Sequence, residues 1–185
     1  MADITLPHLT SSQFADPVNI SILTDAVRKI VDTEAPVCLE VIMDRLCNAC
    51  SIQRKTSAVK DRVYYLIKSL RLPVCEENVT LNGAPDYDRL FVWNSDGIGK
   101  VMPYYRKHSD EQLREAWAVS IEEASCAAIY LCRSQFGMPR DALVHETGKA
   151  LGFKTVTPTV RLLCEKAVDF AVNLGELTGG DRLIK

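Results

Sequence analysis

The stretch from Ser51 to Arg71 contains six basic residues and one acidic residue, which gives it a local charge of +5. Thr56 or Ser57 can cap a helix that runs from there to about Leu70. A step of 100° per residue places one set of apolar side chains on a single side, and these are expected to be core: Val59, Val63, Leu66, Ile67 and Leu70. The other side of this helix is therefore free to do chemistry.

That exposed side combines cations, hydroxyls and aromatic rings, which can neutralise phosphates and contact bases. Asp61 is the one acid on it, and Arg62 lies at one edge. The candidate nucleic-acid-binding residues here are Arg54, Lys55, Ser57, Lys60, Tyr64, Tyr65, Lys68 and Arg71. Two alternatives remain open: a solvated basic face with the tyrosines half buried against a hairpin, and a protein-binding face.

A second basic and aromatic cluster, YYRKH, covers Tyr104 to His108. Arg106 and Lys107 could clamp a phosphate backbone while Tyr104 or Tyr105 stacks on a base. Equally, the tyrosines could pin this segment onto a neighbouring domain. Arg106 and Lys107 complete the set of candidate nucleic-acid-binding residues.

The pair Cys47 and Cys50 has the spacing of a metal motif, with Cys38 and Cys75 as further candidate ligands. A single C-x-x-C is weak evidence, and buried reduced thiols are the simpler interpretation. We therefore expect no metal site and no other cofactor. A zinc-dependent structural module is the weakest of the alternatives.

The sequence offers no constellation typical of catalysis. The three histidines, His8, His108 and His145, lie in a terminal segment, a linker and a short helix, and none is paired with a nucleophile. The chain has neither the phosphate-binding motif GxxxxGK[ST] nor an obvious metal-carboxylate nuclease motif. We expect a protein that is not an enzyme and has no catalytic residues.

The elements that position the basic helix occur twice in the chain. Shifting the sequence by 101 residues lays Ala35–Ile67 over Phe136–Val168 without a gap. Few residues are identical, but the apolar pattern and the order of caps match. Duplication is the favoured explanation.

The pattern of each copy predicts three helices followed by a β-hairpin. In the first copy the helices are an apolar-faced helix ending at Ala35-Pro36, a short helix from about Leu39 to Ala49, and the basic helix. Two strands around a long loop then follow between Pro73 and Trp93.

In the second copy, a capping box at Ser120–Glu123 predicts the start of the first helix and Gly137 its end. Pro139 predicts the first turn of the second helix, and Thr157-Pro158 and Gly175 predict the start and end of the third. Gly179-Gly180 predicts the turn of a hairpin. The expected fold is mostly α with small β-hairpins, as two tandem winged helix-turn-helix-like units. Residues 1–18 form an N-terminal extension, 19–93 the first unit, 94–114 a linker and 115–185 the second unit.

The third helix of the second copy differs in charge. From Gly152 to Val172 the local charge is only +1, and Leu162 faces outward beside Glu165 and Asp169. Such a face binds phosphates poorly. It is better suited to packing on the first copy, on a dimer mate as a homodimer, or on a partner protein.

The bulk properties are those of an ordinary globular protein. The 185 residues have a formal net charge of −2, so any contact with nucleic acid depends on a local patch. No apolar run has the roughly 18 to 20 residues that a membrane span needs, and the N-terminus does not resemble a signal peptide. We expect a cytoplasmic protein with no membrane partner.

The segments beginning IVDTEAPVCLEV and REAWAVSIEEAS resemble the family of unknown function DUF3320. The resemblance covers about Ile20 to Leu177 and is closest at FGMPRDALVHETGKALGFKTVTPTVR. The first copy departs from the pattern at Cys50-Ser51-Ile52, where Leu-Gly-Phe is expected. In larger proteins this region follows a helicase and a nuclease-like domain. The resemblance thus implies an accessory part of a DNA-processing or defence system, with a helicase or nuclease as partner.

Together these features predict a non-enzymatic nucleic-acid-binding module, with DNA as the favoured ligand, that uses the basic helix of the first unit. The main alternative is a protein-interaction or dimerisation module built from winged helices, which makes no contact with nucleic acid.

Overall fold

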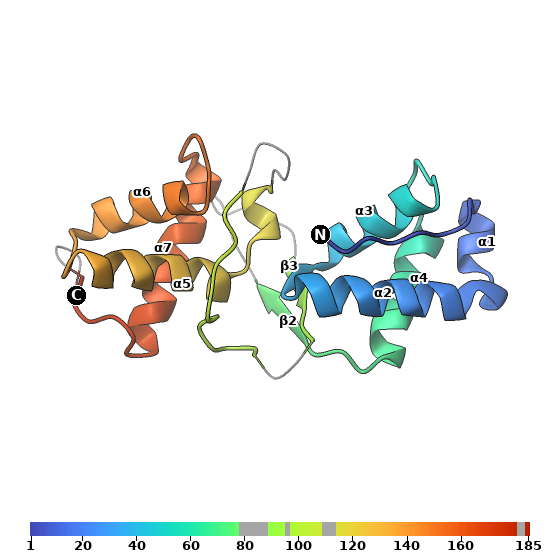
Figure 1. Cartoon of the computed structure of the whole chain (residues 1–185), viewed down its shortest axis with the longest axis horizontal. Coiled ribbons are helices and arrows are strands. Elements are labelled where there is room, and N and C mark those ends of the chain that lie inside the picture. Colours follow the sequence, from blue (N-terminus) through green and yellow to red (C-terminus); the bar gives the residue numbers. More distant parts are fainter. Residues whose placement is uncertain (78–88, 95–96, 109–113, 181–183) are drawn as a thin grey trace. The chain divides into compact units, whose positions relative to one another are not determined.

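The computed structural model describes residues 1–77, 89–94, 97–108, 114–180 and 184–185. The chain divides into two compact units. The first consists of Met1–Glu76 with Leu90–Ile98, and the second of Glu77–Arg89 with Gly99–Lys185. Both units are mostly helical, and Figure 1 shows the helices of each by label.

The first unit begins with two short helical turns, α1 (Ser11–Ala15) and the 3-10 helix η1 (Pro17–Asn19). Its main elements are α2 (Ile20–Glu34), β1 (Val37–Cys38), α3 (Leu39–Ala49), α4 (Ser57–Ser69), β2 (Val74–Glu77) and β3 (Arg89–Val92). The three predicted helices and the two predicted strands are therefore present. The loop predicted between the strands lies in residues 78–88, outside the described residues.

The predicted start and core face of α4 are confirmed. The Thr56 hydroxyl accepts a hydrogen bond from the Val59 amide at 3.4 Å, which satisfies one of the unpaired amides of the first turn. The predicted core side chains Val59, Val63, Leu66 and Ile67 are buried, and Leu70 is half-buried against the same core. The opposite face of α4 is left to solvent.

The first unit has a small antiparallel sheet with strand order β1-β3-β2. Val37 pairs with Val92 and Cys38 with Phe91. The sequence analysis did not predict β1, because two residues are too few for a strand pattern. This strand ties the segment between α2 and α3 to the end of the hairpin.

The second unit consists of the 3-10 helix η2 (Ala116–Ala118), α5 (Ile121–Ser134), α6 (Arg140–Ala150) and α7 (Pro158–Asn173). Two isolated bridges join Ile184 to Met138 and to Gly179. Thr157 caps α7, with Pro158 at its first position, and Gly175 follows its end with φ 74°, as predicted.

The helices of the two units keep one spacing in the sequence. The starts of α5, α6 and α7 each lie 101 residues after the starts of α2, α3 and α4. The same spacing relates Val37, which pairs with the end of the hairpin in the first unit, to Met138, which bridges to Ile184 in the second. Positive φ also recurs at this spacing, at Ser51 (61°) and Gly152 (97°). The two units thus repeat one order of elements.

Each unit also has an extended segment ahead of its helices, which we call a lead segment: residues 2–10 in the first unit and 99–108 in the second. The Leu9 amide donates to the Cys50 carbonyl at 3.1 Å, and the His108 amide donates to the Leu151 carbonyl at 2.8 Å. These two carbonyls are again 101 residues apart. Segments that the sequence assigned to an extension and a linker therefore pack as part of their units.

Among the described residues, no helix is both long enough and apolar enough to cross a bilayer.

Candidate nucleic-acid interface

The predicted contact face of α4 is exposed. Tyr64 and Tyr65 are 43% and 52% exposed, and Ser57, Lys60 and Lys68 are exposed as well. Tyr64 and Lys68 are one helical turn apart, so their side chains neighbour each other. An aromatic ring and a cation therefore lie together on this face.

The charge at the N-terminal end of α4 is smaller than the sequence indicated. The Lys55 Nζ lies 2.7 Å from Asp44 Oδ1 and 3.2 Å from Glu40 Oε2, and the Lys60 Nζ lies 4.0 Å from Glu40 Oε1. Partial burial opposes the charged form of Lys55, but its bonds to Asp44 and Glu40 outweigh burial and raise its pKa. Both acids belong to α3, so the count of +5 over residues 51–71 omitted them.

Arg62 has a structural partner as well as a place beside the tyrosines. Its guanidinium donates to the Ala15 carbonyl at the end of α1, and its Cζ lies 5.5 Å from the centroid of the Tyr65 ring. This cation–π contact fixes the ring of Tyr65 against α4. Arg62 thus positions a ring that a ligand could meet.

The remaining cations of the candidate set are exposed. Arg54 precedes α4, Lys68 lies in its last turn, and Arg71 follows its end with φ 52°. Within the described part of the chain, neither Lys68 nor Arg71 makes an ion pair. Their charge is therefore available to a ligand.

The corresponding helix of the second unit has its charges paired internally. Arg161 lies 2.7 Å from Asp141 and 2.8 Å from Glu165, and Asp169 lies 2.5 Å from Arg140. This pairing agrees with the low charge that the sequence gives for α7. Leu162 is half-buried, less exposed than expected.

The YYRKH cluster is pinned onto the second unit, mainly by Arg106 and His108. The Arg106 amide and guanidinium donate to Glu123 at 2.5 to 3.0 Å. Arg114 donates to both Glu123 oxygens at 2.8 Å. Burial alone would raise the pKa of Glu123, whose side chain is fully buried, but the bonds from Arg114 and Arg106 lower that pKa to about 2. Because its guanidinium is engaged inside the unit, we remove Arg106 from the candidate interface.

The neighbouring residues of this cluster divide between core and surface. The His108 ring is buried in edge contact with Phe153, their centroids 4.4 Å apart, and burial, with Arg114 next, lowers the His108 pKa to about 4. Tyr105 packs toward Tyr130, with ring centroids 6.2 Å apart. Tyr104 and Lys107 are exposed, so Lys107 stays in the candidate set.

Glu123 has a role that the sequence did not predict. Its amide donates to the Ser120 hydroxyl at 3.2 Å, which is half of the expected capping box. Its carboxylate binds Arg106 and Arg114 instead of the backbone of Ser120. The signal available in the sequence was a Glu in the first turn of a predicted helix with two arginines, Arg114 and Arg106, 9 and 17 residues upstream.

The thiols behave as buried side chains. Cys38, Cys47 and Cys50 are buried, and burial raises the pKa of Cys47 and takes that of Cys50 to about 11. Over the described ranges, no group of three or more His, Cys, Asp and Glu side chains is placed to hold a metal ion. His145 is exposed on α6, as predicted.

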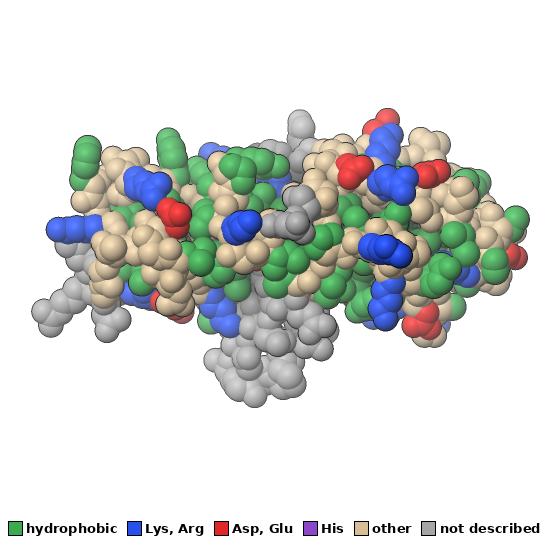
Figure 2. Space-filling view, turned by 90° about the horizontal axis from the view of Figure 1, so that it is seen from below, with side chains coloured by type: hydrophobic (Ala, Val, Ile, Leu, Met, Phe, Trp, Pro, Cys, Tyr) green, Lys and Arg blue, Asp and Glu red, His purple; other side chains and the backbone are tan. Residues whose placement is uncertain are grey.

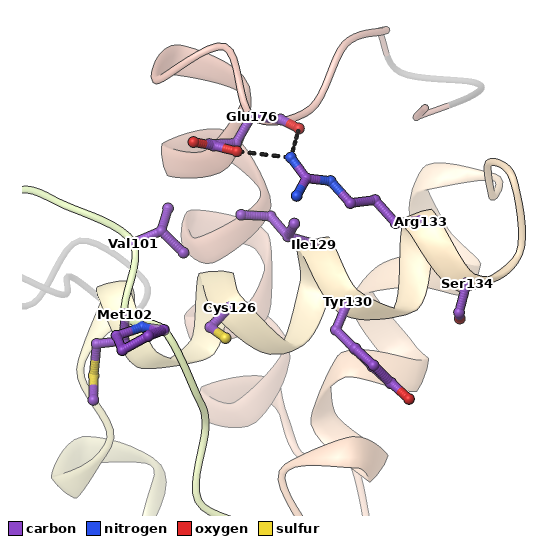
Figure 3. A pocket seen from close by; sticks show the side chains of 9 residues that line it. Val101, Met102, Cys126, Ile129, Tyr130, Arg133, Ser134 and Glu176 are labelled. Carbon is purple, nitrogen blue, oxygen red and sulfur yellow. Dashed lines mark hydrogen bonds and ion pairs between the residues drawn. The ribbon is translucent and has the colours of Figure 1, made fainter.

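The second unit contains a hollow of about 610 Å³ beside α5 (Figure 3). Its walls are mainly apolar and include Val101, Met102 and Ile129. Arg133 reaches from α5 to Glu176, just beyond the end of α7, with 2.7 Å between Nη2 and Oε2. Since this pair satisfies itself, the hollow suits an apolar group better than a phosphate.

The distribution of charge over the surface limits where a polyanion could bind. On the face drawn in Figure 2, Lys and Arg side chains are scattered, some of them beside Asp or Glu, and do not gather in one broad basic patch. A polyanion that binds on this face thus contacts a few scattered cations.

Comparison with known proteins gave one family. Residues 12–61 match the model of a family described as a protein of unknown function, DUF3320. The matched segment runs from α1 into the first turns of α4, which supports the family relationship for the first unit. The sequence had led us to expect the closer resemblance in the second unit. Searches of curated proteins and of solved structures found no match.

Proposed function

We propose that this chain is a non-enzymatic accessory module that binds nucleic acid through the exposed face of α4, with DNA as the favoured ligand. The observation that supports this most is the placing of Tyr64 and Tyr65 beside Lys68 and Arg71 on the solvent side of the third helix. Rings stack on bases and cations neutralise phosphates, so this face offers both kinds of contact.

We further infer that each unit is a winged helix-turn-helix. Support comes from the order helix, strand, two helices, two strands in the first unit, and from its sheet order β1-β3-β2. In such a fold the third helix is the one that contacts nucleic acid. A shared fold does not by itself imply a shared function, so the case for nucleic-acid binding depends on the side chains of α4.

The proposed contacts are narrower than the set predicted from the sequence. Arg54, Lys68 and Arg71 meet phosphates, and the two tyrosines meet bases. Ser57 remains as a minor contact of this face, and Lys107 as a separate candidate contact on the second unit. Lys55 and Lys60 contribute little, because Glu40 and Asp44 lie against them.

The larger setting is proposed from the family relationship. The resemblance to DUF3320 implies a place beside helicase and nuclease-like domains, so we propose that the chain holds DNA for such an enzyme, in the cytoplasm. The match to residues 12–61 supports the family relationship, and the enzyme partner is part of the proposal.

Fluorescence anisotropy with labelled oligonucleotides, followed over a salt titration, tests the binding. Three phosphate contacts predict a slope of about −2 in log K against log salt, so affinity should fall about 15-fold from 50 to 200 mM salt. Lys68→Glu with Arg71→Glu should abolish binding. Lys29→Glu, at an exposed site on α2, is the matched control. An affinity that changes neither with salt nor with the charge reversal at Lys68 and Arg71 would refute the proposal.

A second candidate function is protein contact through the second unit. It is favoured by Phe136, which follows α5 with φ 57° and is 93% exposed. A bulky residue seldom adopts this backbone conformation, and here it presents an aromatic ring that a partner protein can contact. Light scattering of the purified chain tests for a second copy as the partner, and Phe136→Ser should then yield the monomer.

A further inference from the structure

The charge along α4 changes from one end to the other. At the N-terminal end, the exposed acids Glu40 and Asp44 of α3 hold Lys55, and Glu40 also lies near Lys60. At the C-terminal end, Lys68 and Arg71 are exposed and, among the described residues, have no acidic partner. Arg54, ahead of the helix, is the one exposed cation at the other end that makes no ion pair among the described residues. A polyanion is therefore attracted more strongly to the C-terminal half of the helix than to its start.

This gradient opposes the usual docking of such a unit on a duplex. A recognition helix inserts its N-terminal residues into the major groove, and the preceding helix lies near the backbone. That pose would bring Glu40 and Asp44, whose side chains are 43% and 46% exposed, toward the phosphates. Because these acids and the two lysines largely neutralise each other, the start of α4 offers phosphates little attraction, and the pose is disfavoured.

The aromatic residues lie at the end where the cations are available. Tyr64 and Lys68 are four residues apart, which places them along one stripe of α4, and Arg71 follows just beyond the end of the helix. Tyr65 adds a second ring, backed by the guanidinium of Arg62 at 5.5 Å. Ring faces bind the faces of bases, and base faces are accessible only where the strand is unpaired.

We infer that the ligand of this site is single-stranded nucleic acid, seated on the C-terminal half of α4. The inference rests on the proposed function and specifies its ligand class. Tyr64 and Tyr65 stack on unpaired bases, and Lys68 and Arg71 neutralise the phosphates between them. Asp61, one turn before Tyr64 and Tyr65, marks the N-terminal limit of the site.

The test compares one labelled oligonucleotide as a single strand and as a duplex, with a single-stranded RNA arm, on the full chain at 50 mM salt. Single strands should bind at least about 10-fold more tightly than the duplex. Tyr64→Ala and Tyr65→Ala should each weaken single-strand binding about 5- to 100-fold. Tyr64→Phe should retain it, because stacking uses the ring. Tyr130→Ala, which removes an exposed tyrosine of α5, is the matched control and should change nothing.

A second variant tests the role of the acids. Glu40→Gln with Asp44→Asn frees Lys55 and Lys60, so it should raise duplex affinity by more than it raises single-strand affinity. Circular dichroism confirms that each variant is folded before its binding is interpreted.

The outcomes separate this inference from the proposed function. Equal or tighter duplex binding that Lys55→Glu and Lys60→Glu abolish would overturn the inference and leave the proposed function standing. Failure of the folded chain to bind either form would overturn both. Preference for single-stranded RNA over DNA would keep the inference and change the favoured polymer.

Discussion

The two arginines on Glu123 should stabilise the second unit jointly. The Glu123 carboxylate is fully buried and is bound by Arg106 and Arg114. Replacing Arg106 with Met keeps most of the side-chain stem and leaves Arg114 on both oxygens. We expect this change to cost about 1.5 kcal/mol of unfolding free energy, the lower end of the range for a hydrogen bond to a charged group, because Arg114 still balances the charge. Arg114→Met should cost a similar amount.

The double variant should cost more than the sum of the two single variants. Without either arginine, a carboxylate is buried with no counter-charge. The cost should lie in the upper part of the range of about 3 to 5 kcal/mol for such a charge, above the sum of about 3 kcal/mol for the two single variants. The pKa of Glu123 gives a similar scale: its depression from 4.5 to about 2 corresponds to about 3 kcal/mol. The control is Arg133→Met, which breaks an exposed ion pair with Glu176 and should cost less than about 1 kcal/mol.

The pH dependence gives a second sign of the same mechanism. In the parent protein, the stabilisation from Glu123 is present above its unfolded pKa and is lost as the pH falls toward 2. In the double variant only the backbone amide of residue 106 opposes the effect of burial, so the folded pKa of Glu123 rises and its contribution to stability should increase as the pH falls from neutral.

Urea unfolding measures these effects in the second unit. The chain has two tryptophans, and a Trp93→Phe background leaves Trp117, in η2 close to Arg114, as the fluorescent reporter. Additive single and double variants, or a double variant that loses stability with acid as the parent does, would refute the joint role of the arginines.

Three further predictions concern the lead segments and the turns beneath them. Gly152→Ala should cost more than about 2 kcal/mol by urea unfolding, since φ is 97° there and a Cβ would lie 2.8 Å from the backbone of His108; an unchanged midpoint would contradict this. Ser51→Gly should raise the melting temperature of the first unit, because Ser51 has φ 61° and glycine removes about 1 kcal/mol of strain; a lower melting temperature would exclude strain there. His108→Phe should make the unfolding free energy depend less on pH. The pKa of buried His108 is about 4, below its usual 6.5, so the parent loses up to about 3 kcal/mol of unfolding free energy as the pH falls from 6.5 to 4. An equally steep loss in the variant would show that His108 is not its cause.

Much of the fold was predictable because its signals are local. The start of α4 follows from Thr56 and the start of α7 from Thr157-Pro158, and each cap acts within three residues. The apolar spacing of Val59, Val63 and Ile67 likewise acts within one helix. Strand β1 was missed because its two residues pair with a strand more than 50 positions away.

The candidate site was predictable in outline but not in its charge. The exposure of Tyr64, Tyr65 and Lys68 follows from the period of one helix, which the sequence contains. The pairing of Lys55 with Glu40 and Asp44 depends on how α3 packs against the turn before α4.

The sequence by itself determined where the helices begin and end and which face of each is apolar, because caps, prolines and helical periodicity act over a few neighbouring residues. Only the tertiary structure decided which charges remain available. Arg106 and Lys55 looked equivalent to Lys68 in the sequence, yet Arg106 is bound to Glu123 and Lys55 to two acids of α3. An ion pair is set by distance in space, and folding brings together partners that are 11 to 17 residues apart in the chain.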